Sequence, residues 1–407
     1  MTKYIFILLS TSLFSQTTNL TSSPYSLYGL GKINEYSNGV LNSFGYGGIS
    51  MNNDYELNLL NPASLGNIRK NAFILDVGVK GEINRYGDNS DSDKKPSFNF
   101  SNISFGLGID EKSGLSLSLI PYSEVGYEFQ GIVNSFEGNQ ETYFSNILGS
   151  GGVNVINLNY GREINKKINL GLNLKYFFGS INQTEIVYLD DDNLFLESDT
   201  NYKGIGLTTG IQYKIINNLI LSNTFTFPTT LKASKDLKVS KLIDQNYSTI
   251  NETYDEKINS FNTPYEIAFG IKYDLKKYSF IGDFKQSFWS YLNQTDDVGK
   301  FVDNYKFNFG IERRTIDEFN AKSKFRYRVG FSYNQGNLLV NNNRISNMSY
   351  TAGISIPINT QKHTYINFSY AYNSKGLVSN TLIKEKSHSI SLSLNLFDIW
   401  FKKRVIE

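Results

Sequence analysis

Apolar and polar residues alternate with a period of two along most of the chain after residue 71. Neighbouring side chains of a β-strand point to opposite faces, so this pattern predicts strands with one apolar and one polar face. In the segment 265–273, every odd position carries Tyr, Ile or Phe. Several segments also have tyrosine at the ends of the apolar row and aliphatic residues in its middle, which is the order expected across a lipid bilayer.

The alternation predicts about fourteen strands, an even number, as single-chain outer-membrane barrels have. Their expected bounds are 72–86, 97–110, 113–133, 152–164, 168–189, 196–216, 219–232, 262–275, 277–292, 303–315, 322–335, 346–358, 363–375 and 386–401. Tight turns alternate with longer polar loops between them, and the longest expected loops are 134–151 and 233–261. We therefore expect an all-β fold, a transmembrane antiparallel β-barrel with its short turns in the periplasm. A soluble β-sandwich or propeller, the alternative, gives no reason for alternating loop lengths.

The first residues have the pattern of a secretory signal peptide. Lys3 is followed by the apolar run 4–9 and by the small residues 10–15, after which Gln16 would begin the mature chain. A buried first strand is the alternative interpretation. We expect three parts: a signal peptide at 1–15 for export through the Sec pathway, an N-terminal hatch at 16–71, and a barrel at 72–407.

Residues 16–71 do not follow the strand pattern and are rich in Gly, Ser and Asn. A compact plug inside the barrel is favoured over a flexible tail, because a structureless run of this length beside a compact domain is uncommon. The apolar residues expected to form the plug and its pocket are Phe44, Tyr46, Ile49, Met51, Leu57, Leu59 and Leu60.

Composition narrows the function further. The chain has no Cys and only 2 His, which excludes disulfide scaffolds and thiol enzymes and disfavours a metal site. A formal net charge of +2 disfavours nucleic acid as a partner, and a mean hydropathy of −0.32 disfavours a helical membrane protein. We expect neither a cofactor nor enzymatic activity.

Asn61-Pro62-Ala63, which follows the apolar residues of the expected plug and precedes the first strand, resembles the signature that ends the N-terminal hatch of FadL/TodX-type outer-membrane transporters of hydrophobic compounds. Further segments are similar to that family, and the chain ends resemble an uncharacterised Bacteroidota branch of it. These segments are 263–271, 282–290 and 327–333 within the barrel, and 23–31 and 398–403 near the chain ends.

This resemblance implies a protein of the Gram-negative outer membrane that passes hydrophobic small molecules, such as fatty acids, through a plugged barrel with a side exit into the bilayer. Pro121 supplies a physical candidate for the exit, because a proline within a strand cannot donate to the ladder and produces a kink or bulge. We assign the kink to Pro121, Tyr122 and Gly126. A bulge that only shapes the barrel is the alternative.

Several charged residues fall on the expected inward face of the strands. They form either a mutually paired network that fills the lumen or a cationic spot for a carboxylate headgroup. The main ones are Lys272, Lys306, Glu312, Arg326 and Arg328.

Two functions remain open. The first is a channel for uptake of hydrophobic small molecules, with outer-membrane lipids as its surroundings. The second is a non-transporting accessory barrel of an outer-membrane secretion or assembly complex. An apolar pocket between plug and lumen favours the first, because an accessory barrel has no need to keep a pocket open. The sequence names neither the substrate, the direction of flux, the partner chains nor the oligomeric state.

Overall fold

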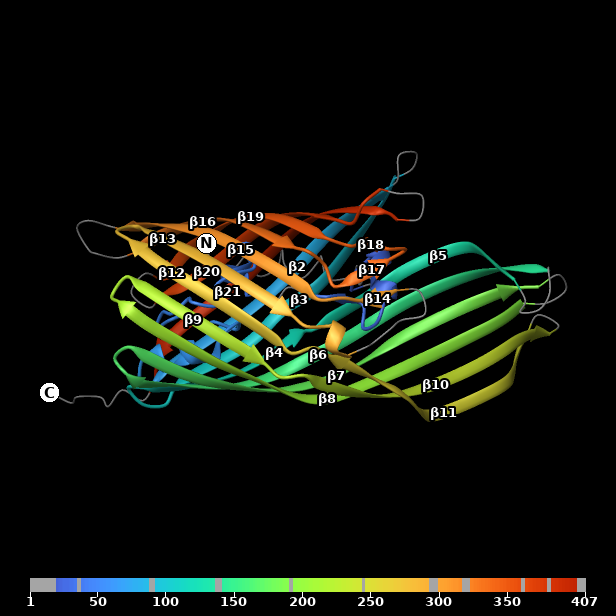
Figure 1. Ribbon diagram of the computed structural model, residues 1–407, viewed down its shortest axis with the longest axis horizontal. Helices are drawn as coiled ribbons and strands as arrows, with labels where there is room; N and C mark the ends of the chain where they lie inside the picture. Colours follow the sequence, from blue (N-terminus) through green and yellow to red (C-terminus); the bar gives the residue numbers. More distant parts are fainter. Residues whose placement is uncertain are drawn as a thin grey trace, which may run out of the picture.

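A computed structural model describes residues 20–34, 38–87, 92–135, 141–189, 193–243, 246–292, 299–316, 323–359, 363–378 and 382–400. Fourteen antiparallel strands in this part of the chain form one closed barrel, as the alternation predicts (Figure 1). The expected signal peptide, residues 1–15, lies outside the described residues. No helix in the described ranges is long and apolar enough to cross a membrane.

Each barrel strand pairs with its neighbours in sequence, and the ring closes where β2 pairs with β21. Eleven of the fourteen strands are continuous in the described ranges, and three are interrupted. The continuous strands are β2 (Ala72–Gly87), β3 (Ser92–Gly108), β6 (Thr142–Asn165), β7 (Ile168–Tyr188), β8 (Asn193–Ile216), β13 (Tyr278–Ser287), β15 (Asn304–Ile316), β16 (Ser323–Asn334), β19 (Asn347–Asn359), β20 (Thr364–Lys375) and β21 (Lys384–Ile399). The interrupted strands are β4 (Ser113–Pro121) with β5 (Ser123–Ser135), β9 (Leu219–Thr226) with β10 (Thr229–Ile243), and β11 (Asn246–Thr263) with β12 (Glu266–Leu275).

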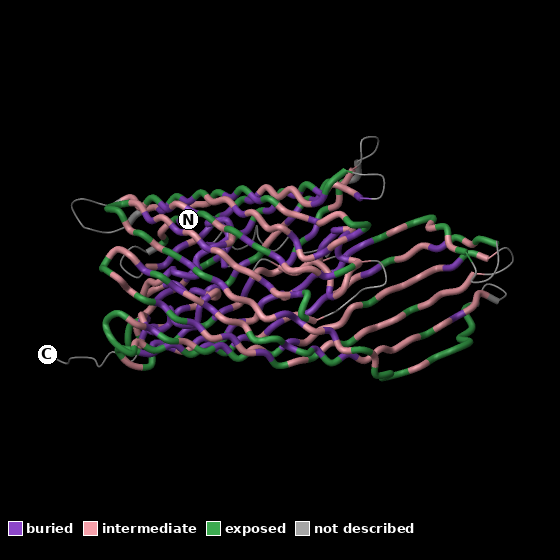
Figure 2. The backbone as a smooth tube through the Cα atoms, viewed as in Figure 1, coloured by how far each residue is buried: buried purple, intermediate pink, exposed green. Residues whose placement is uncertain are grey.

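The two faces of the wall meet different surroundings. On β7, Leu170, Leu172 and Leu174 point outward and are about half exposed, whereas Asn169 and Asn173, which alternate with them, are buried inside. Figure 2 shows the same alternation of buried and exposed residues along the other strands. An apolar outer band around a polar interior is the arrangement of a transmembrane β-barrel.

Two expected loops are largely strand. Residues 142–151 extend β6, and 233–261 form most of the hairpin of β10 and β11. Together with the outer parts of β5, β7 and β8 they make a six-stranded sheet that projects beyond the rest of the barrel at its long-loop end (Figure 1). The sequence prediction was wrong here because this sheet leaves the lipid band, so its residues are not required to alternate between apolar and polar.

The described residues before β2, 20–34 and 38–71, lie within the barrel (Figure 1). It contains η1 (Pro24–Leu27), β1 (Lys32–Ile33), α2 (Gly39–Asn42) and η2 (Pro62–Asn67). Near the projecting sheet, η3 (Ser290–Leu292) and a small sheet of β14 (Lys300–Phe301), β17 (Leu338–Val340) and β18 (Asn343–Arg344) complete the described elements.

Candidate functional site

The N-terminal segment packs against the inner wall through the apolar residues that its sequence singles out. Phe44 and Met51 belong to one buried cluster, on which Leu60 packs, and Leu57 belongs to another, on which Leu59 packs. The remaining two, Tyr46 and Ile49, line the lumen cavity described below. The wall carries glycine where the segment approaches most closely: a Cβ at position 310 would lie 2.6 Å from the Phe44 ring.

Backbone groups of this segment also bond to side chains of the wall. Gly45 N–H donates to Thr351 Oγ1 (2.9 Å), and Gly48 N–H donates to Asp283 Oδ2 (2.5 Å). These bonds satisfy polar groups that would otherwise be buried without partners, which costs about 1–3 kcal/mol for each group.

The Asn61-Pro62-Ala63 motif joins the segment to the barrel. Asn61 caps η2 by accepting a hydrogen bond from Ala63 N–H (3.0 Å), and Pro62 takes the first helical position, where its missing N–H has no cost. The Asn61 amide also donates to the carbonyls of Ile49 (3.2 Å) and Ile211 (3.3 Å). Asn61 therefore links the end of the N-terminal segment both to the middle of that segment, at Ile49, and to strand β8, at Ile211.

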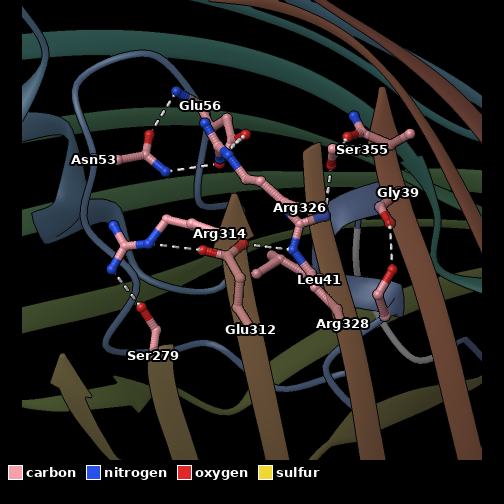
Figure 3. Close-up of polar contacts among 12 residues, drawn as sticks. Gly39, Leu41, Asn53, Glu56, Ser279, Glu312, Arg314, Arg326, Arg328 and Ser355 are labelled. Atoms are coloured by element: carbon pink, nitrogen blue, oxygen red, sulfur yellow. Dashed lines mark hydrogen bonds and ion pairs between the residues drawn. The ribbon is translucent and has the colours of Figure 1, made fainter. Parts of the chain in front are cut away.

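A buried charge network connects this segment to β15 and β16 (Figure 3). Arg326 donates to Glu56 (2.8 Å) and lies between the rings of Tyr55 and Tyr365. On the same wall, Arg328 donates to Glu312 (2.7 Å).

The structure brings together four of the five lumen charges that the sequence predicts, namely Lys272, Glu312, Arg326 and Arg328. Lys272 pairs with Asp274 (3.0 Å), and Arg314 connects Asp274 (3.0 Å) to Glu312 (3.6 Å). Only Lys306 of the five lies elsewhere, 5.8 Å from the centre of the Tyr46 ring. Sequence reasoning missed Glu56, because no periodic pattern marks inward positions in a non-repetitive segment.

A second charge cluster that the sequence did not indicate lies between β1 and β2. Glu82 pairs with both Lys32 (2.5 Å) and Lys80 (2.7 Å). Lys32 belongs to the N-terminal segment, so this cluster also joins that segment to the wall.

The strand that contains Pro121 is interrupted, as its sequence predicts. β4 ends at Pro121, β5 begins at Ser123, and the Tyr122 N–H still donates to Val153 of β6 (2.7 Å). On the other side, β3 pairs with β4 from Gly108 only as far as Ile103. Beyond that point β3 keeps its partner β2, and within the described residues it forms no ladder with β5. The barrel wall therefore has a gap in its backbone pairing between β3 and β5.

The N-terminal segment occupies this gap. Lys32 and Ile33 of β1 pair with Glu124 and Ser123 of β5 in place of β3, and Asn34 N–H donates to the Tyr122 carbonyl (3.0 Å). A Cβ at Gly126 would lie 1.8 Å from the Thr21 carbonyl oxygen, so only glycine admits the segment there.

Two side-chain contacts also cross the gap. Asn99 of β3 donates to Glu124 (2.7 Å), and Lys95 pairs with Glu128 (2.9 Å).

A lumen cavity of about 300 Å³ reaches the gap. One part of its wall is aromatic, with Phe177, Phe261, Trp289 and Phe301 belonging to a single buried cluster. Another part is charged. The lining includes residues from both sides of the gap, namely Phe100, Ser101, Pro121 and Tyr122. The Tyr122 ring meets Phe177 edge-on at 5.0 Å between centroids.

The family model BamG matches residues 1–407. The chain belongs to the BamG family. No curated protein matches it.

Solved structures that resemble this BamG-family barrel share its fold at low sequence identity. One is the toluene transporter TodX of P. putida, with 14% sequence identity and a TM-score of 0.66; the match covers 91% of this chain and 100% of that one. Another is the monoaromatic hydrocarbon channel CymD, with 16% identity and a TM-score of 0.63; the match covers 90% of this chain and 98% of that one. A FadL homologue of Pseudomonas aeruginosa is similar as well, with 11% identity and a TM-score of 0.64; the match covers 90% of this chain and 99% of that one. The expected FadL/TodX-type architecture is thus confirmed, and the narrower likeness to a Bacteroidota branch stays a prediction.

Proposed function

We propose that this barrel takes up hydrophobic small molecules and releases them sideways into the outer membrane through the gap between β3 and β5. One observation carries the proposal: the lumen cavity has an aromatic wall and reaches the strand interruption at Pro121. Solved barrels of the same architecture are described as transporters of toluene and channels for monoaromatic hydrocarbons, which supports an apolar substrate.

The energetic reason for a sideways route is the free-energy cost of exposing an apolar chain to water. Each CH₂ group that stays out of water is worth about 0.8 kcal/mol, so a long acyl chain would lose several kcal/mol on entering the periplasm. Passage from cavity to bilayer avoids that loss. In the described state Lys32–Ile33 fills the gap, so release requires β1 to leave β5.

A disulfide between β1 and β5 tests this route. Ile33 and Ser123 are register partners, and cross-strand Cα atoms lie about 4.5–5.5 Å apart, within the range that a disulfide bridges. The chain has no native Cys, so the Ile33→Cys/Ser123→Cys bridge would be unique. The matched control is Ile354→Cys/Phe368→Cys, which joins two register partners of the closed wall.

Uptake of radiolabelled oleate is measured in cells that lack their own long-chain fatty acid transporter. We expect the oxidised β1–β5 variant to lose uptake and to regain it on reduction, while the control pair transports in both states. Full uptake by the oxidised variant would exclude the sideways route.

A non-transporting accessory barrel is the second candidate, and the contacts that hold the N-terminal segment favour it. The buried pair Arg326–Glu56 and the bonds around Asn61 hold this segment against the wall without any need for a substrate. Absence of uptake by the unmodified protein, for oleate and for toluene, would support this candidate over transport.

A further inference from the structure

Three lysines gather on the outer face of the wall where the projecting sheet begins. Lys203 of β8 and Lys232 of β10 are register partners, so they lie directly opposite each other. Ser234, the next residue of β10 on the same face, is the register partner of Lys257 in β11. All three lysines are exposed.

The neighbouring residues establish that these lysines point away from the lumen. Leu231 and Ala233, on either side of Lys232, are buried inside. A Cβ at Gly204, beside Lys203, would lie 2.6 Å from the Leu231 side chain. Ile205, the next outward residue of β8, is 69% exposed. Because strand side chains alternate, Lys203 and Lys232 share the outer face with Ile205.

The arrangement concentrates positive charge. Like charges directly opposite each other in a sheet are destabilising, and none of the ion pairs found among the described residues involves these three side chains. On β8 and β10 the nearest carboxylates of this face are Asp199 and Asp236, each four residues away along its strand, about 13 Å at the usual strand rise. On β11, Asp255 is two residues from Lys257, and its N–H donates to Asp236.

Other lysines of β10 are placed differently. Lys235 lies opposite Glu256, and Lys238 lies opposite both Glu197 and Glu252. Lys235 and Lys238 are thus matched with carboxylates, whereas Lys232 lies opposite another lysine, and an external anion would supply the missing charge there.

The position along the membrane normal indicates which anion. Apolar residues lie next to the lysines on the outer face. Ile205 is two residues from Lys203 on β8, and Phe178, the β7 partner of Lys203, stacks with Tyr176 at 5.9 Å between centroids. Aromatic side chains on the outer surface of a barrel concentrate at the level of the lipid headgroups. The lysines lie at the long-loop end, which faces outward from the cell in barrels of this type.

We propose that Lys203, Lys232 and Lys257 bind the phosphate of an anionic lipid of the outer leaflet, whose acyl chains lie against Ile205 and Phe178. The shared chemistry is a phosphate group, and the apolar residues next to it favour a lipid over free phosphate. This site is on the outside of the wall and does not depend on whether the lumen transports anything.

The test compares binding of fluorescent bis-phosphorylated lipid A to the purified full-length protein in detergent. The variant is K203Q/K232Q/K257Q, and the matched control is K166Q/K167Q/K276Q, which removes the same charge from exposed turns at the other end of the barrel. Each lysine near a membrane surface contributes roughly fivefold in affinity. We therefore expect the variant to bind about 100-fold more weakly, with the control unchanged.

Further arms separate the sources of phosphate. Dephosphorylated lipid A should bind weakly to all three proteins, and millimolar inorganic phosphate should fail to displace the phosphorylated lipid. Equal affinity of the variant and the unmodified protein would overturn the site, and displacement by inorganic phosphate would overturn its assignment to a lipid. If the triple variant does not assemble into a heat-modifiable barrel, K232Q alone, with an expected loss of about fivefold, provides the same test.

Discussion

The ion pair between Glu56 and Arg326 should control how firmly the N-terminal segment stays in the barrel. The two side chains are each 3% exposed, and their atoms lie 2.8 Å apart. Removing one partner of a buried ion pair leaves the other charge uncompensated, which costs about 3–5 kcal/mol. Glu56→Gln keeps the shape of the side chain and removes only its charge.

The unpaired Arg326 charge destabilises only the state in which the segment is docked, because release of the segment exposes Arg326 to water in the lumen. A loss of about 3 kcal/mol corresponds to roughly a 100-fold increase in the population of the released state. Glu312 lies close enough to Arg328 to pair with it (2.7 Å) and offers Arg326 only partial compensation, so we take the lower end of the range.

Hydrogen exchange followed by mass spectrometry measures this population directly. Peptides from residues 38–66 of Glu56→Gln should exchange about 100-fold faster than in the unmodified protein, while peptides from β19 and β20 should not change. Glu128→Gln is the matched control, because its partner Lys95 is 36% exposed and an exposed pair contributes only about 0–1 kcal/mol. Unchanged exchange in Glu56→Gln, or an equal increase in Glu128→Gln, would refute the reasoning.

Three further predictions concern the topology, the plug and the exit. Cysteine at Ser248 should react with a membrane-impermeant maleimide on intact cells and cysteine at Asn217 should not; the reverse labelling would contradict the topology. Deleting residues 24–60 should raise conductance for small ions in planar bilayers, since a barrel of about fourteen strands is too wide for its wall side chains to fill, and unchanged conductance would argue against a plug. Pro121→Val, which adds an N–H and a good strand former, should reduce oleate uptake at equal surface expression without loss of barrel stability; uptake equal to that of the unmodified protein would leave Pro121 as a simple bulge.

Successive side chains of a strand face the lipid and the lumen in turn, so the sequence alone was enough to predict the barrel. The rows of apolar residues located the wall strands, and the same alternation placed Arg326, Arg328 and Glu312 on the inside. Proline chemistry is local as well, so a kink or bulge at Pro121 could be predicted from the sequence.

Only the tertiary structure determined which partners these residues contact. Arg326 and its partner Glu56 are 270 positions apart, and Lys32–Ile33 takes the place of β3 beside β5, far from it in sequence. No periodic pattern encodes such pairings, because they depend on how a non-repetitive segment folds back into a closed lumen. Two parts of the projecting sheet, the outer part of β6 and the hairpin of β10 and β11, were missed for a related reason: outside the bilayer both faces of a strand tolerate polar residues, so the alternation that marks a strand weakens.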